Sequence, residues 1–423
     1  MKHNLLRNMN FTIGVTYWPR RKATKWWQAF DRGEVEEELA HVAALGCHLV
    51  RIPLLWSAVQ PTADRLDHRI LDHLGETLDA AHMAGLLAVV DLQVGLACGA
   101  FNLPDWAMDP QPFTTPTGVS FDLPVRQIVH GREEIRYRLR NPFEDEKMIR
   151  AQRRLFREVI GFYADHPAIF GWSLGHELDR ARPPRASEAA GEWLEYRASE
   201  IREVTGASRL FWYSDLAAFA RPIGMRPNTV AAVLGTVAIE VHPGLHPMAE
   251  HPLDVELVRF AVALTRALAP ETPIWVAGCT VPTVPIPGDP GMMLIDVVDS
   301  NEREVYFASE SEQEEFVGQI LERLIANGIA GCWLGYYADF EESLWEEPPL
   351  DRARRERTSG LVRRDGSEKP AAKAVRRVRK QLDIGQLIPE QRERRLEIDL
   401  EEYWQDPRRH LYRLYDEYRE GRF

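Results

Sequence analysis

A glutamate at the end of an apolar run is the first feature of this sequence that could carry out chemistry. The run is Ala168-Ile-Phe-Gly-Trp-Ser-Leu-Gly-His-Glu-Leu178, in which Glu177 follows a small-residue break at Gly175. A short buried strand would explain the run, and its last residues would emerge from the core and present a carboxylate to a cavity. Such a carboxyl group can act as a general acid or base. A glutamate after an apolar run is also common at the start of a helix or in a loop, so the surrounding elements must decide.

Strand-like apolar runs alternate with helical patterns along most of the chain. The eight runs cover residues 11–18, 47–55, 86–93, 168–178, 210–214, 237–242, 274–278 and 329–337. This alternation is typical of a parallel sheet built from βα units. We therefore predict an α/β protein with a (β/α)8 barrel, in which catalytic side chains lie at the carboxyl ends of the strands.

Two long stretches and the C-terminus complete the predicted organisation. Residues 94–141 and 279–310 are too long for ordinary connections, so we expect functional loops at the C-terminal face of the barrel. Residues 1–382 would form the barrel, closed by a helix over 371–381. Residues 383–423 are highly charged and contain aromatic side chains, which indicates a helical appendage packed on the outside of the barrel.

Polar and aromatic residues fall at the same ends of these strands. Arg51 lies in an apolar run, where a buried guanidinium needs carboxylate partners. A carboxylate and an arginine beside aromatic rings suit a sugar, which has apolar C–H faces and a polar rim. The alternative for each tryptophan is packing in the core. The predicted substrate-binding residues at this rim are Arg51, His176, His242, Trp333, Trp18, Trp56 and Trp106.

Composition excludes several classes of partner. The net charge of −12 argues against nucleic acid and against an anionic membrane surface. The four cysteines show neither the spacing of a metal site nor a disulfide framework, so we expect no metal and no other cofactor. No apolar run reaches the ~20 residues of a membrane span. Residues 1–10 lack the apolar region of a secretion signal, and a cytoplasmic protein with free thiols is expected.

Between residues 11 and about 370 the chain resembles the large clan of retaining (β/α)8 glycoside hydrolases that includes cellulases, β-mannanases and β-galactosidases, and within it the bacterial cellulase family glycosylhydrolase proteins. The similarity lies in the order and spacing of five pieces. They are Ile13-Gly-Val-Thr-Tyr-Trp-Pro19, Val50-Arg-Ile52, Asn102-Leu-Pro-Asp-Trp106, Gly171-Trp-Ser-Leu-Gly-His-Glu177 and Gly360-Leu-Val-Arg-Arg-Asp-Gly-Ser-Glu-Lys-Pro370. The resemblance implies two catalytic carboxylates: an acid/base after strand four, which is Glu177 here, and a nucleophile at the end of strand seven.

The chain departs from the family pattern at both places. His176 stands where the family has an asparagine, which hydrogen-bonds the 2-hydroxyl of the sugar. The family's P-V-x-x-x-E-F-G-x-P-T aligns with Pro273-Ile-Trp-Val-Ala-Gly-Cys-Thr-Val-Pro-Thr283, so the nucleophile falls on Gly278. A glycine supplies no second carboxyl group, which both retaining and inverting hydrolysis need.

These departures predict a barrel that binds β-linked carbohydrate but has lost turnover, with a binding or scaffold role and room for a protein partner or a second copy of the chain. The alternative is an active β-glycosidase whose second carboxylate comes from another position. The replacement candidates are Asp215, Asp289 and Asp339, with Cys279 as a weaker thiolate candidate because nothing nearby in sequence would lower its pKa.

Overall fold

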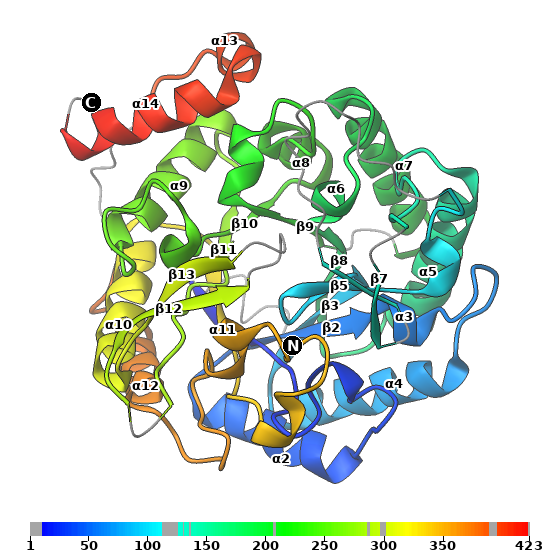
Figure 1. The fold of residues 1–423 in the computed structure, drawn as a ribbon, viewed down its shortest axis with the longest axis horizontal. Helices are drawn as coiled ribbons and strands as arrows, with labels where there is room; N and C mark the ends of the chain where they lie inside the picture. The colour runs from blue at the N-terminus through cyan, green and yellow to red at the C-terminus, as the bar shows by residue number, and fades with distance from the viewer. Residues whose placement is uncertain are drawn as a thin grey trace.

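Eight parallel strands form a closed barrel in the computed structural model, in the order β1-β14-β11-β10-β9-β8-β3-β2. The structure describes residues 11–111, 126–129, 131–134, 137–205, 209–285, 288–296, 302–388 and 396–421. The prediction that no secretion signal is present concerns residues 1–10, which lie outside these ranges. Parts of the two long loops, at 112–125 and 297–301, also lie outside them. The predicted (β/α)8 architecture is confirmed, and Figure 1 shows the strands at the centre with helices around them.

The barrel strands lie within a few residues of the predicted runs. They are β1 (Thr12–Thr16), β2 (Leu49–Leu55), β3 (Leu87–Val94), β8 (Ile169–His176), β9 (Leu210–Asp215), β10 (Val237–Glu240), β11 (Ile274–Ala277) and β14 (Gly331–Tyr336). Most of their residues are buried because helices cover the outer face while side chains fill the interior. The covering helices are α2 (Arg32–Ala44), α4 (His68–Met83), α5 (Glu146–Tyr163), α7 (Ser187–Thr205), α8 (Pro227–Leu234), α9 (Val255–Leu268), α10 (Glu310–Ala326) and α12 (Pro370–Asp383).

Side-chain caps explain where several of these helices begin. An aspartate precedes four of them and accepts a hydrogen bond from a backbone N–H of the first turn; these residues are Asp31 (α2), Asp67 (α4), Asp145 (α5) and Asp254 (α9). Ser309 and Glu312 form a reciprocal capping box at the start of α10. Each such cap stabilises its helix by about 1 kcal/mol. The local sequence therefore specifies where these helices begin.

Aromatic rings fill the interior of the barrel below the strand ends. Trp333 on β14 lies 4.5 Å from Trp275 on β11 and 5.4 Å from Phe211 on β9, measured between ring centroids. Tyr213, two residues farther along β9, lies above this layer and carries the Arg51 guanidinium 3.9 Å from its ring centroid. Aromatic side chains therefore fill the barrel interior below the layer that contains Arg51.

The long connections after β3 and β11 contain secondary structure that the sequence patterns did not reveal. The first includes a small sheet of β4 (Leu96–Ala97), β5 (Ala100–Leu103), β6 (Gln127–Val129) and β7 (Arg132–Glu134). The second includes an antiparallel hairpin of β12 (Gly291–Asp296) and β13 (Glu302–Phe307). Short helices follow three barrel strands: α3 (Trp56–Val59), α6 (Leu178–Ala181) and α11 (Arg354–Arg357).

The C-terminal residues form helices α13 (Leu400–Gln405) and α14 (Pro407–Arg419), which lie beside α9 at the edge of the barrel (Figure 1). Their buried aromatic side chains make the contacts. The Tyr415 hydroxyl donates a hydrogen bond of 2.7 Å to Asp254, and the Tyr403 hydroxyl donates one of 2.9 Å to the carbonyl of Phe219. Among the helices of the described ranges, none combines the length and the apolar character that a membrane crossing requires.

Candidate active site

Glu177 lies directly after β8 and is almost fully buried, with 2% of its surface exposed. Its backbone is in the left-handed region, with φ 52° and ψ 31°. For a residue with a Cβ this conformation costs about 1–2 kcal/mol, and such strain is concentrated at functional sites. The backbone N–H of Glu177 donates to the carbonyl of Tyr213 on the neighbouring strand, which holds the turn in place.

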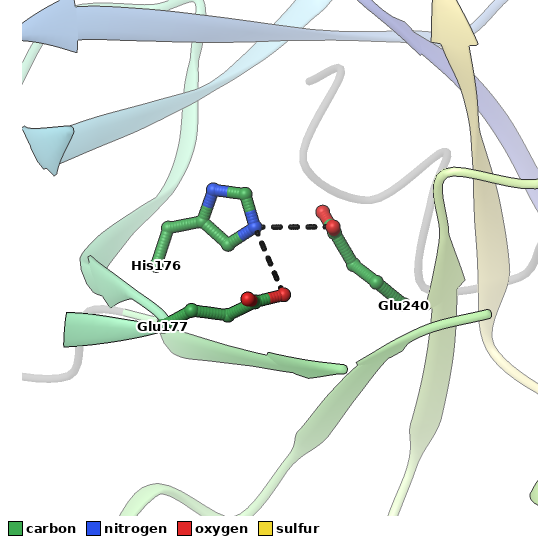
Figure 2. Close-up of side chains that lie close together, drawn as sticks. All are labelled: His176, Glu177 and Glu240. Carbon is green, nitrogen blue, oxygen red and sulfur yellow. Dashed lines mark ion pairs between the residues drawn. The ribbon is translucent and has the colours of Figure 1, made fainter. Parts of the chain in front are cut away.

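A second carboxylate faces Glu177 from β10. Glu240 is the last residue of that strand, and one of its oxygens, one oxygen of Glu177 and a ring nitrogen of His176 all lie within 4.8 Å of one another. Figure 2 shows one ring nitrogen of His176 facing both carboxylates. Sequence reasoning missed Glu240. The available signal was a charged residue inside an apolar run, the same signal that singled out Arg51.

Arg51 provides one side of the support for Glu240. Its Nε donates to Asp91 over 2.6 Å and its Nη1 donates to Glu240 over 2.9 Å. The expected carboxylate partners of this buried guanidinium are therefore present, one on β3 and one on β10. A buried charge needs such partners because removing it from water costs several kcal/mol.

A second group of ion pairs supports Glu177. Arg180 Nη1 lies 3.0 Å from Glu177 Oε2 and 3.5 Å from Asp215. Arg221 lies 3.4 Å from Asp215 and 3.8 Å from Asp179. Together with the pairs around Arg51, five carboxylates and three guanidinium groups form one connected network through His176, with a net charge of −2 when all five carboxylates are ionised and the imidazole is neutral.

The environments of the two glutamates move their pKa values in opposite directions. Burial, and then the negative charge of Asp215, raise the pKa of Glu177 to about 7. Burial acts in the same direction on Glu240, but His176, His242 and Arg51 outweigh it and hold its pKa well below the usual value. Two carboxyl groups whose pKa values are moved apart in this way supply one proton donor and one anion at neutral pH.

The imidazole of His176 lies against both carboxylates. Its Nε2 lies 3.0 Å from Glu240 Oε2 and 3.7 Å from Glu177 Oε1. Burial opposes protonation of His176, but the charge of Glu240 outweighs it and raises the pKa of the imidazole. His176 is thus brought into the centre of the site, where the resemblance placed a sugar-binding side chain.

The ring of His242 occupies the space beside Gly278. Strand β10 ends at Glu240, two residues earlier than predicted, so His242 does not end the strand but precedes the turn that follows it. Gly278 has φ +75°, and a Cβ there would lie 2.5 Å from Cε1 and 2.7 Å from Nε2 of the His242 ring. Arg355 holds this ring by donating from Nη2 to Nδ1 over 2.7 Å. An imidazole therefore fills the position into which a longer side chain at 278 would extend.

The tryptophans are placed at different levels of the barrel. Trp333 is buried in the interior, 5.8 Å from the ring of Tyr213, which in turn lies 5.9 Å from the ring of His176. Trp56 and Trp106 pack edge to face and donate to Gln60 over 2.8 Å each. Trp18 is buried after β1. Stacking of a sugar on these rings stays a prediction.

The other candidates for a second carboxylate have different surroundings. Asp339 is buried and accepts from Lys369 Nζ over 2.8 Å, while Asp289 is exposed. Asp215 caps the turn after β9 by accepting from Ala218 N–H over 2.8 Å, and it shares Arg180 with Glu177. Cys279 is buried, with Sγ 3.9 Å from the carbonyl of Val241. Glu240 is therefore the carboxylate that the described structure places against Glu177.

Comparison of the sequence with known protein families gave one match. A family described as β-galactosidase, glycoside hydrolase family 42, matches residues 25–221, which is less than half of the chain. The match includes Arg51 and Glu177 but ends before Glu240. No curated protein sequence matched the chain.

Comparison of the structure gave similar barrels among glycoside hydrolases. A GH5_18 variant from Streptomyces cattleya, solved in complex with Manβ1-4GlcNAc, is 21% identical with a TM-score of 0.69, covering 90% of this chain and 83% of that chain. A GH5_18 protein from Bifidobacterium longum subsp. infantis is 19% identical with a TM-score of 0.66, covering 88% and 79%. The exo-β-1,4-mannosidase Op5Man5 from Opitutaceae bacterium strain TAV5 is 21% identical with a TM-score of 0.62, covering 88% and 60%. At these identities the likeness establishes the fold alone: the chain shares the (β/α)8 barrel of these proteins.

Proposed function

We propose that this barrel hydrolyses β-glycosidic bonds, with Glu177 as the acid/base and Glu240 as the second carboxylate. The observation that carries the proposal is the approach of the two carboxylates to within 4.8 Å, at the ends of strands four and six of the barrel. Retaining glycosidases place their carboxyl groups about 5–5.5 Å apart, whereas inverting enzymes need about 6.5–9.5 Å to admit a water. The short separation favours retention of configuration.

Each carboxylate has the surroundings that its role requires. Protonated Glu177 would give its proton to the glycosidic oxygen while ionised Glu240 attacks the anomeric carbon, and the aglycone would leave as an alcohol. Glu177, now a carboxylate, would take a proton from the water that cleaves the glycosyl ester and restores Glu240. Arg51 holds Glu240 in place through a hydrogen bond to Oε1, which leaves Oε2 available. Productive binding requires His176 to turn out of the gap between the two oxygens.

The test is hydrolysis of aryl β-glucosides, β-mannosides and β-galactosides, together with Manβ1-4GlcNAc because a structural neighbour was solved with that disaccharide. We expect wild-type turnover, loss of at least about 100-fold in kcat/KM in Glu177→Gln and in Glu240→Gln, and no change in the surface control Glu158→Gln. Azide should restore activity to Glu240→Ala with inverted product configuration. Wild-type activity that survives Glu240→Gln would refute the assignment of the second carboxylate.

A second candidate is sugar binding without turnover, and the position of His176 favours it. With Nε2 3.0 and 3.7 Å from the two carboxylate oxygens, the imidazole would have to move before an anomeric carbon could approach both of them. This candidate predicts saturable binding of a β-linked disaccharide by calorimetry with no release of reducing sugar. Turnover of that disaccharide would exclude it.

A further inference from the structure

We infer that His176, Glu177 and Glu240 form a binding site for a single divalent transition-metal ion of the Zn²⁺ class. The inference goes beyond glycoside hydrolysis and does not depend on it, because it concerns what the three side chains bind when no sugar is present. It was not expected from the sequence, in which the three residues show no metal-ligand spacing.

The two carboxylates are oriented so that an arginine binds one oxygen of each and the other oxygen faces His176. Arg51 binds Oε1 of Glu240 and Arg180 binds Oε2 of Glu177. The other two oxygens, Oε2 of Glu240 and Oε1 of Glu177, face Nε2 of His176 at 3.0 and 3.7 Å. Hydrogen-bonded partners that orient ligating side chains in this way are a regular feature of metal sites.

The imidazole nitrogen gives an independent indication. His176 is more than nine-tenths buried, with 8% of its surface exposed, and its Nε2 makes no hydrogen bond of acceptable geometry despite the short distance to Glu240. A buried polar atom without a hydrogen bond costs about 1–3 kcal/mol. A metal ion between the three atoms would remove that cost because it accepts the nitrogen lone pair directly.

The neighbouring His242 is excluded as a fourth ligand by its tautomer. Arg355 can only donate, so Nδ1 of His242 is the acceptor and the proton of the neutral ring is on Nε2. That nitrogen lies 3.9 Å from Oε2 of Glu240 and faces it as a donor. The site thus has three protein ligands and an open position, the arrangement of zinc sites that bind water or substrate.

Charge and distance both suit a dication. With all five carboxylates ionised and His176 neutral, the connected network of ion pairs carries −2, a charge that one divalent ion cancels. Ligand atoms at about 2.1 Å from a tetrahedral Zn²⁺ lie about 3.4 Å from one another; the two distances from His176, 3.0 and 3.7 Å, lie on either side of that value, and the two carboxylate oxygens lie within 4.8 Å of each other and would draw together around the ion. One nitrogen and two oxygen ligands favour Zn²⁺ or Mn²⁺ over Mg²⁺, which retains its waters.

The test is isothermal titration calorimetry of ZnCl2 into the full chain, purified without a histidine tag and in the absence of sugar. We expect one saturable site per chain, an affinity lower by at least about 100-fold in His176→Gln and in Glu240→Gln, and unchanged binding in His68→Gln, which removes an exposed histidine instead. MgCl2 should bind far more weakly. Absence of a one-to-one site, or equal affinity in wild type and both site variants, would overturn the inference.

A second measurement covers the case in which a site variant does not fold. Wild-type crystals soaked in ZnCl2 should give an anomalous peak between Nε2 of His176 and the two carboxylate oxygens. A peak elsewhere, or none, would overturn the inference. Neither measurement involves turnover, so a failure of the proposed hydrolysis leaves the metal result intact, and the reverse also holds.

Discussion

Restoring a glutamate at position 278 should fail to create a conventional retaining site, and the smaller change Gly278→Ala isolates the reason. Gly278 has φ +75°, where a residue with a Cβ pays about 1–2 kcal/mol. The added Cβ would also lie 2.5 Å from the His242 ring, and overpacking of this kind costs about 1–3 kcal/mol. We therefore expect Gly278→Ala to lower the free energy of unfolding by about 2–5 kcal/mol.

The assay is urea denaturation followed by tryptophan fluorescence, arranged as a double-mutant cycle with His242→Ala. Removing the imidazole should relieve the overpacking but not the backbone strain. The coupling energy between the two substitutions should therefore be about 1–3 kcal/mol, with the double variant more stable than the sum of the single changes predicts. Gly235→Ala, at φ +70° with no atom within 4 Å of the added Cβ, is the matched control for backbone strain alone.

Equal losses in Gly278→Ala and Gly235→Ala, with no coupling to His242→Ala, would refute this reasoning. The space beside residue 278 would then be open, and Gly278→Glu should hydrolyse aryl β-glycosides faster than wild type. If the reasoning holds, Gly278→Glu is no more active than wild type or unfolds more readily, because an imidazole already occupies the space that the added side chain would need.

Two further predictions concern regions away from the site. Burial raises the pKa of Glu38 to about 7 from an ordinary value of 4.5, so the folded state prefers the protonated form. Stability from this group should be present below pH ~4.5 and lost as the pH rises toward ~7, by about 3 kcal/mol in total. Because Glu177 also has a raised pKa, both proteins should lose stability between pH 5 and pH 8, but thermal unfolding should show a larger loss in wild type than in Glu38→Gln; equal losses in both proteins would contradict the prediction. In the C-terminal helices, Tyr415→Phe removes the hydrogen bond to buried Asp254 and should cost about 1–3 kcal/mol in urea denaturation. Tyr412→Phe, a change in a less buried ring of the same helix, should cost almost nothing, and equal effects would show that α14 contributes no stability through Asp254.

Local patterns in the sequence were sufficient for the barrel. The eight strands lie within a few residues of the predicted ranges, because apolar periodicity is a property of contiguous residues. The same local signals singled out Glu177 at the end of β8 and Arg51 inside β2. The small sheet in the first long loop escaped prediction because its strands are only two to four residues long. The hairpin strands of the second loop have six residues each and were missed because the whole segment was interpreted as one loop.

The composition of the site was decided by tertiary structure. Glu177 and Glu240 are 63 positions apart and lie on strands separated by β9, so only closure of the barrel brings their carboxylates together. Alignment of Gly278 with a lost nucleophile led to the expectation of an impaired enzyme, because a sequence alignment records which side chain is missing at one strand end. It does not record that His242 fills the space beside Gly278, or that Glu240 reaches the site from the adjacent strand β10. Those facts depend on distances across the barrel, which no spacing along the chain encodes.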